Sequence, residues 1–246
     1  MRRILTTAIL LGVVTSAAAS PPPVAVTACG QAVPRRTVGY LTGDLDCTGP
    51  QSGAAALAAV FVAKRGTLEL HGYTIHGSLF GIACGEPATD STGQTVLTNV
   101  DTCTINGGGG GVTDAEIDGI TAKKLTARDL TIRNSGEEGA FALFKGVLNN
   151  VTITDNGGFG ARLDYIAKIT NSTITGNGEY GIDTGRLWLT GSTVTGNGIG
   201  PNCGPSPLLH CADLHVYRRP KLIQSTCGTS VMTTQATISW GVCQLD

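Results

Sequence analysis

The sequence repeats one hexapeptide four times, as LTIRNS at 130–135, VTITDN at 151–156, STITGN at 172–177 and STVTGN at 192–197. Successive copies start 21, 21 and 20 residues apart. A period this short holds only a small supersecondary unit, and such a unit is stable only when it is stacked on its neighbours. The repeat therefore predicts a solenoid.

Apolar residues recur at the same points of each repeat. The centre of each hexapeptide is apolar and lies between polar residues, which is the two-residue period of a half-buried strand. Stacking the copies puts three sets of residues into interior columns: Ile132, Ile153, Ile174 and Val194; Ala140, Ala161 and Ile182; Leu148, Ile169 and Leu189. Three short strands joined by turns in each repeat describe one rung of a parallel β-helix.

Asparagine also recurs with the repeat. Asn156, Asn177 and Asn197 end three of the four hexapeptides, and a glycine follows each of them. Strands of stacked rungs lie ~4.8 Å apart, so each amide can bond the next one along the stack. We therefore expect an asparagine ladder at a tight turn, interrupted in the first copy by Ser135.

These repeats, together with GTLELHGYTIHGS at 66–78, resemble the right-handed parallel β-helix superfamily with the pectate-lyase-like fold. The resemblance is strongest to bacterial secreted members with short internal repeats, and it covers roughly residues 65–200. It implies an all-β, single-stranded, right-handed parallel β-helix of about seven or eight rungs. Because this architecture carries lyases, hydrolases, epimerases and adhesins, the resemblance implies a fold and not one activity.

The rest of the chain divides around this solenoid. Residues 1–19 have the basic start, short apolar run and small-residue end of a secretory signal peptide. We expect a linker and N-terminal cap over 20–64, the parallel β-helix over 65–200, and an insert and cap over 201–246. Five consecutive glycines at 107–111 predict a loop at the rim of the helix or a lid over it.

Composition limits the partners. The net charge of −1, with only 14% charged residues, gives no basic surplus for nucleic acid or for an anionic membrane. The apolar run of the signal peptide is also too short to span a bilayer. We therefore expect a secreted or periplasmic monomer that contacts neither.

Eight cysteines in an exported chain favour disulfides over a metal site. Eight cysteines allow 105 pairings. A solenoid keeps sequence neighbours together, so we favour four local bridges that close the ends of the helix: Cys29–Cys47, Cys84–Cys103, Cys203–Cys211 and Cys227–Cys243. No cysteine or histidine spacing suggests a metal.

Candidate site residues lie one step outward from the buried columns. If Ala161 and its counterparts point inward, Arg162 and Asp183 share an exposed column, and we expect Asp164 and Lys168 beside them as the catalytic cluster. Substrate-binding candidates are Tyr165, Arg186 and, on a second exposed column, Arg133. A cation next to a proton acceptor is what a lyase acting on uronate sugars needs. The competing interpretation is an ordinary ion pair between Arg162 and Asp183.

Two functions remain open at this stage. One is a β-helix that binds or processes carbohydrate, with polysaccharide lyase activity on uronate-containing glycans as its enzymatic form. We expect no cofactor for it, except Ca²⁺ if the protein is a lyase. The sequence signatures of polygalacturonases and of the large pectate lyases are missing. We interpret the four histidines as surface or turn residues: His71, His76, His210 and His215. The other function is a non-enzymatic cell-envelope or adhesin-like structural protein that displays rows of threonines.

Overall fold

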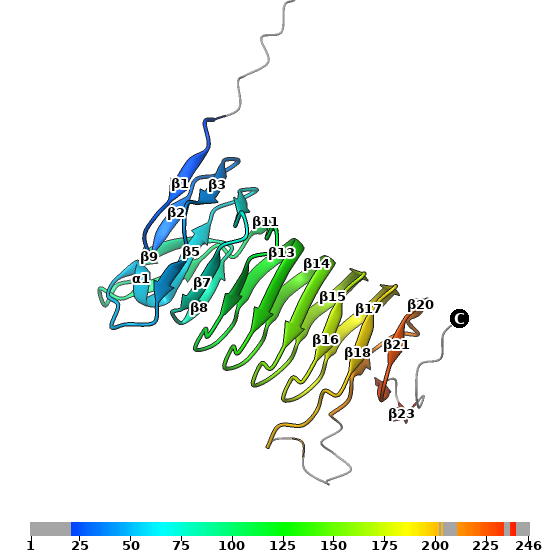
Figure 1. Cartoon of the computed structure of the whole chain (residues 1–246). Helices are drawn as coiled ribbons and strands as arrows, with labels where there is room; N and C mark the ends of the chain where they lie inside the picture. Colours follow the sequence, from blue (N-terminus) through cyan, green and yellow to red (C-terminus); the bar gives the residue numbers. More distant parts are fainter. Residues whose placement is uncertain (1–20, 202, 204–210, 234–236, 240–246) are drawn as a thin grey trace, which may run out of the picture.

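A computed structural model describes residues 21–201, 203, 211–233 and 237–239. Over these residues the chain forms a right-handed parallel β-helix whose rungs follow the sequence from one end to the other (Figure 1). The predicted signal peptide, His210 and Cys243 lie outside the described residues. Each rung contributes to three stacks of parallel strands, which we name the Leu148 sheet, the Ile153 sheet and the Ala161 sheet after one interior residue of each.

Two of the sheets account for most of the short strands. The Leu148 sheet contains β1 (Val24–Val26), β3 (Val38–Leu41), β6 (Thr67–Glu69), β11 (Thr102–Asn106), β20 (Lys221–Ile223) and the middle or end of four long strands. These long strands are β13 (Ile120–Arg133), β14 (Ala140–Thr154), β15 (Ala161–Thr170) and β17 (Ile182–Thr190). The Ile153 sheet contains β4 (Leu45–Cys47), β7 (Thr74–Gly77), β12 (Gly111–Thr113), β16 (Thr173–Thr175), β18 (Thr193–Thr195), β21 (Thr226–Cys227) and the ends of β13 and β14.

The Ala161 sheet is formed by the starts of the four long strands together with β2 (Gln31–Val33), β5 (Ala58–Val62), β8 (Phe80–Ala83), β19 (Leu214–Val216) and β22 (Ser230–Thr233). Strand β23 (Thr237–Ser239) pairs with β22 in the antiparallel direction. Parallel pairing thus extends beyond residues 65–200 on both sides. Strands β1, β2 and β4 pair in parallel with later strands, and β20 and β22 pair in parallel with earlier ones.

The predicted columns are confirmed by the register of the strands. Ile132, Ile153, Ile174 and Val194 follow one another as paired residues, and all four are fully buried. The Ala140 and Leu148 columns also pair in register. The hydrophobic core is therefore a continuous rod along the axis of the solenoid, as the repeat predicts.

The asparagine ladder is present in the turn after the Ile153 sheet. The Asn177 amide nitrogen donates to Oδ1 of Asn197 at 2.7 Å, and its Oδ1 accepts from Asn156 at 2.8 Å. The ladder ends on the buried carboxylate of Asp213, which accepts from the Asn197 amide at 2.8 Å. At the other end the backbone N–H of Ser135 donates to Asn156 at 2.9 Å. These bonds satisfy polar groups that the turn removes from water.

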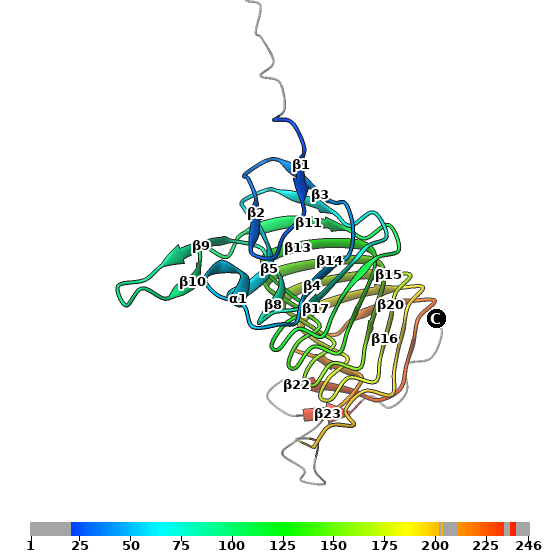
Figure 2. The ribbon, with the colours of Figure 1, turned by 60° about the vertical axis from the view of Figure 1, so that its left-hand side comes forward.

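Two insertions interrupt the early rungs. Strands β9 (Glu86–Thr89) and β10 (Thr95–Thr98) form an antiparallel hairpin that projects from the solenoid (Figure 2). Helix α1 (Ala54–Leu57) is a single turn that leads directly into β5. Within the part of the chain that the structure describes, no helix has the length and apolarity to cross a membrane.

The glycine run at 107–111 is a tight turn and not a lid. Val112, directly after it, pairs with Ile75 on one side and with Ile132 on the other. A side chain on Gly110 would collide with the backbone oxygen of Tyr73, so glycine is required by the close approach of neighbouring rungs. Of the two predicted alternatives, a loop at the rim or a lid, the lid was wrong, because these glycines allow the chain to pack closely between neighbouring rungs.

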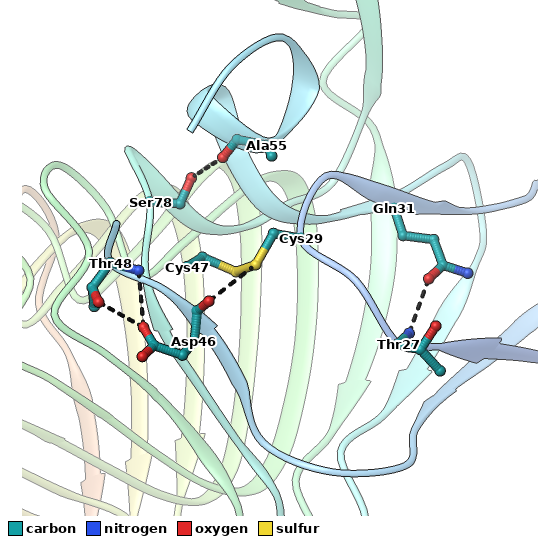
Figure 3. Close-up of a disulfide and its surroundings, with 8 residues drawn as sticks. All are labelled: Thr27, Cys29, Gln31, Asp46, Cys47, Thr48, Ala55 and Ser78. Carbon is teal, nitrogen blue, oxygen red and sulfur yellow. Dashed lines mark hydrogen bonds between the residues drawn. A yellow bond between two sulfur atoms is a disulfide. The ribbon is translucent and has the colours of Figure 1, made fainter. Parts of the chain in front are cut away.

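Three of the predicted disulfides are confirmed: Cys29–Cys47, Cys84–Cys103 and Cys203–Cys211. Cys227 is also disulfide-bonded, and Cys243, its predicted partner, is outside the described residues. Figure 3 shows Cys29–Cys47 in the first rungs, where Asp46 accepts hydrogen bonds from Thr48. The Cys84–Cys103 bridge joins the two ends of the segment that contains the β9–β10 hairpin. It therefore fixes the base of an insertion, in addition to the predicted role of closing one end of the solenoid.

Candidate functional site

The outward side of the Ala161 sheet carries a column of four polar and aromatic residues. Phe141 pairs with Arg162, Arg162 with Asp183, and Asp183 with His215, on the successive strands β14, β15, β17 and β19. Each is partly exposed, while the residues on either side of it along the strand are buried. The alternation of the strands therefore aims these four side chains at solvent.

A second column runs beside the first at the turn that enters the sheet. The backbone bonds Gly119 N to Glu138 O, Gly139 N to Phe159 O and Gly160 N to Tyr180 O place Asp118, Glu138, Phe159 and Tyr180 on successive rungs. Six of the ten phenylalanine and tyrosine residues lie in these columns or at the corner that follows them: Phe141, Phe144, Phe159, Tyr165, Tyr180 and Tyr217. We call this surface the aromatic face.

Arg162 is at the centre of the aromatic face. Its guanidinium lies 3.4 Å from Glu138 and 3.4 Å from Asp164. It also lies 5.6 Å from the ring centre of Phe141 and 5.5 Å from that of Phe159. Burial lowers the pKa of Arg162, but Asp164 and Glu138 outweigh it and raise this pKa above its ordinary value. Arg162 is therefore a fixed cation and not a proton acceptor.

Asp183 bonds His215 and not Arg162, its neighbour in the column. Its Oδ1 lies 2.8 Å from Nδ1 of His215, and since a carboxylate only accepts, the imidazole donates from Nδ1. The His215 ring stacks on Tyr180 with 4.7 Å between ring centres, and Tyr180 stacks on Phe159 at 5.6 Å. The rings of successive rungs thus cover one another's faces and form a ridge along the axis.

Asp118 and Glu138 form a pair of buried carboxyl groups at the edge of the aromatic face. They are 6% and 8% exposed, and the Glu138 backbone N–H donates to Asp118 at 3.4 Å. Burial is the largest of the effects that raise the pKa of Asp118 to about 8, and the neighbouring Glu138 carboxyl group is the second. Asp118 is therefore protonated at neutral pH, and the Glu138 carboxyl group lies beside Arg162.

This pair predicts how stability depends on pH. Between about pH 4 and pH 8 the folded protein keeps a proton on Asp118 that the unfolded chain releases, so the free energy of unfolding falls as the pH rises. The variant Asp118→Asn removes the titration but retains a donor for Glu138. In urea unfolding at several pH values, we expect the stability of the variant relative to wild type to increase from pH 4 to pH 8. The exposed Asp129→Asn serves as the control, and parallel curves for Asp118→Asn and wild type would contradict the assignment.

The same carboxyl groups, together with Glu137, form a cluster of acidic oxygens. Oxygens of Asp118, Glu137 and Glu138 lie within 4.8 Å of one another, which is close enough for one divalent ion. The Arg162 guanidinium, 3.4 Å from Glu138, offsets part of the charge of this cluster. A cation next to this pair would compete with the Arg162 guanidinium for Glu138, and we derive no step through a metal.

The structure brings several of the predicted site residues together. Arg162, Asp164, Tyr165, Asp183 and Arg186 all lie on the aromatic face or at its corner. Tyr165 stacks on Phe144 with 5.3 Å between ring centres. A hollow of about 340 Å³ lies beside this pair, and we name it the Gly185 hollow. Residues around it include Asp164, Tyr165, Gly185, Arg186, Tyr217 and Arg218.

Two predicted residues lie elsewhere. Lys168 is on the Leu148 sheet, with its ammonium 5.6 Å from the ring of Trp188, because the chain turns a corner after Asp164. Arg133 points outward from the Ile153 sheet, beside a hollow formed with the glycine turn at 109–111. Neither joins the cluster around Arg162.

Sequence reasoning missed Asp118, Glu138 and His215 as members of the site. Asp118 and Glu138 each directly precede a glycine that recurs in every rung, and Phe159 and Tyr180 take the same position in later rungs. The spacing of these glycines could therefore have revealed that the four residues share a column. His215 was interpreted as a surface or turn residue, but it continues the column of Arg162 and Asp183. Its distance of 32 residues from Asp183 hid it, because an insertion separates the two rungs.

Comparison with models of known protein families finds no match, and comparison with curated proteins finds none either. Among solved structures, the crystal structure of pectate lyase Pel9A is similar to this chain, with 11% sequence identity and a TM-score of 0.46. The match covers 78% of this chain and 55% of that chain, so this chain spans about half of the length of the lyase. At this identity the likeness is one of fold alone.

Proposed function

We propose that this protein is exported and binds glycan chains on its aromatic face. The observation that carries the proposal is the concentration of six of the ten phenylalanine and tyrosine side chains on one side of the solenoid, around a fixed guanidinium and several carboxyl groups. Aromatic rings with polar groups at their edges bind sugars, because they offer an apolar surface next to hydrogen-bond partners. The disulfides are consistent with an oxidising compartment.

The exposed aromatic side chains are the main contacts in this proposal. Phe159 and Tyr180 cover one another, so they form a rigid support with little free ring surface. Phe144, Tyr165 and Tyr217 are 41%, 62% and 49% exposed, and they are the rings that reach solvent. Exposed aromatic side chains on a rigid sheet lose little entropy on binding.

Binding is favoured over a lyase reaction by the state of Arg162. A lyase needs a group that removes a proton, and Arg162 holds its own proton between two carboxylates. Lys168, which was predicted to lie in the same catalytic cluster, lies on a different sheet. The alternative of a passive envelope protein offers no reason for aromatic side chains to gather on one side.

The proposal is tested by electrophoresis in native gels that contain pectate, alginate, xylan or a sulfated galactan. We expect at least one of these glycans to retard the wild-type protein. The double variant Phe144→Ala/Tyr165→Ala should weaken the affinity at least about tenfold, because central aromatic contacts are worth more than ~1 kcal/mol each. Tyr40→Ala/Tyr73→Ala removes two rings outside the aromatic face and should bind as wild type does.

Two further measurements complete this test. A chelator should leave the retardation unchanged, since the proposed contacts need no metal, and absorbance at 235 nm should stay flat when the protein is incubated with the retarding glycan. Absence of retardation by every glycan, together with association with cell-envelope fractions, would replace the proposal with the structural alternative.

A further inference from the structure

The Gly185 hollow exists because two neighbouring rungs differ in length. Leu163 pairs with Thr184 and Ile166 pairs with Arg186, so Asp164 and Tyr165 on one rung stand against Gly185 alone on the next. The rung of Gly185 is therefore recessed at this corner, in the manner of a bulge that gives one strand an extra residue. Tyr217 and Arg218, which follow the end of β19 on the next rung, also line the hollow.

One wall of the hollow is the face of an aromatic ring. Tyr165 and Phe144 are nearly parallel, with 14° between their planes, and Phe144 belongs to the preceding rung. The opposite face of Tyr165 therefore points along the axis toward the rung of Gly185. A Cβ atom on Gly185 would lie 3.0 Å from the backbone oxygens of Asp164 and Tyr165, so a side chain here would occupy the space next to the ring. Glycine keeps that space open.

The charge around the hollow is positive. Arg186 and Arg218 are exposed, and neither forms an ion pair with any other described residue. Asp164 is the one carboxylate in the lining, and it lies 3.4 Å from Arg162, which offsets part of its charge. Two guanidinium groups next to a ring face suit a ligand that is itself a ring with an anionic substituent.

We infer that the Gly185 hollow is a subsite for a single sugar ring that carries a carboxylate or a sulfate ester. The ring inserts with its plane parallel to Tyr165, hence across the solenoid axis, and its anionic group lies between Arg186 and Arg218. Tyr165 and Tyr217 are two rungs apart, or about 10 Å, which leaves room for one ring between them. This inference rests on the proposed glycan binding. It adds the position of one sugar ring and the residues that recognise the charge of that ring.

Isothermal titration calorimetry with the full chain tests the inference. The ligands are three oligosaccharides of equal length, which end in galacturonate, in sulfated galactose or in neutral galactose. We expect at least one anionic ligand to bind about tenfold or more tightly than the neutral one, and Arg186→Gln or Arg218→Gln to remove this preference. Arg219→Gln, a neighbouring exposed arginine outside the lining, should retain it.

Gly185→Leu should abolish binding of the anionic ring by filling the hollow, and circular dichroism checks that the variant is folded. If it is not folded, the arginine variants still decide the question. Equal binding of neutral and anionic ligands, or arginine variants that keep the preference, would overturn the subsite while the proposed glycan binding stands. No binding of any glycan by wild type would instead remove the proposed function itself.

Discussion

Gly160→Ala is expected to destabilise the protein by about 3 kcal/mol or more. Gly160 does not adopt the left-handed backbone conformation. Glycine is needed here because neighbouring atoms leave no space for a side chain. An added Cβ would lie 2.6 Å from Cγ2 of Ile174, 2.7 Å from the Asn177 amide nitrogen and 2.7 Å from the backbone oxygen of Gly181. The oxygen belongs to the next rung, which cannot move without disturbing the stack.

Thermal unfolding followed by circular dichroism measures this effect. For a domain of this size we expect a fall in Tm of roughly 6–12 °C, at about 2–4 °C per kcal/mol. Gly43→Ala is the matched control, because a Cβ on Gly43 would meet nothing within 4 Å, and it should stay within about 0.5 kcal/mol of wild type. A Gly160→Ala protein as stable as the Gly43→Ala protein would show that the rungs do not approach one another this closely.

Asn177→Ala should destabilise the protein by about 3 kcal/mol or more, because each donor that is left buried without a partner costs ~1–3 kcal/mol. Asn177 is fully buried, and its Oδ1 accepts from both the backbone and the side-chain amide of Asn156, at 3.2 and 2.8 Å. Its own amide donates to Oδ1 of Asn197 at 2.7 Å. Alanine leaves two donors of Asn156 buried without partners and leaves a cavity. Oδ1 of Asn197 loses one of its two hydrogen bonds and keeps the one from the Asn177 backbone N–H.

Urea unfolding of the variant provides the measurement. Asn149→Ala deletes the same group from an exposed position of the Leu148 sheet and should change stability by less than about 0.5 kcal/mol. Asn177→Asp adds a second test, since a carboxylate keeps the acceptor but loses the amide donor and places a charge in the ladder. If Asn177→Ala and Asn149→Ala had equal effects, the ladder would contribute nothing to stability.

The regular rungs were predictable because their spacing is nearly constant. Ile153 pairs with Ile174, and Ala140 with Ala161, at the separations that the hexapeptides show. The first rungs were not predictable, because insertions change the spacing: Gly39 pairs with Leu68, and Leu68 with Ile105. A period that varies this much leaves no detectable repeat in the sequence.

The aromatic face was predictable only in part. Arg162 and Asp183 were placed in one column by the repeat, and the structure confirms that register. Lys168 was placed near them by closeness in the sequence, but the corner after Asp164 turns it onto another sheet. Closeness along the chain therefore misleads at corners, where a few residues change the direction in which side chains point.

The sequence by itself determined the solenoid, the order of its sheets along each rung and the residues that share a column, because a fixed period forces equivalent residues to stack. Only the tertiary structure decided which ion pairs and hydrogen bonds the exposed side chains form. Arg162 lies between Glu138 and Asp164 and forms no ion pair with Asp183, which instead bonds His215. Likewise, the Gly185 hollow follows from one residue fewer in a rung. Such choices depend on corner geometry and on distances of a few ångströms, which periodicity does not specify.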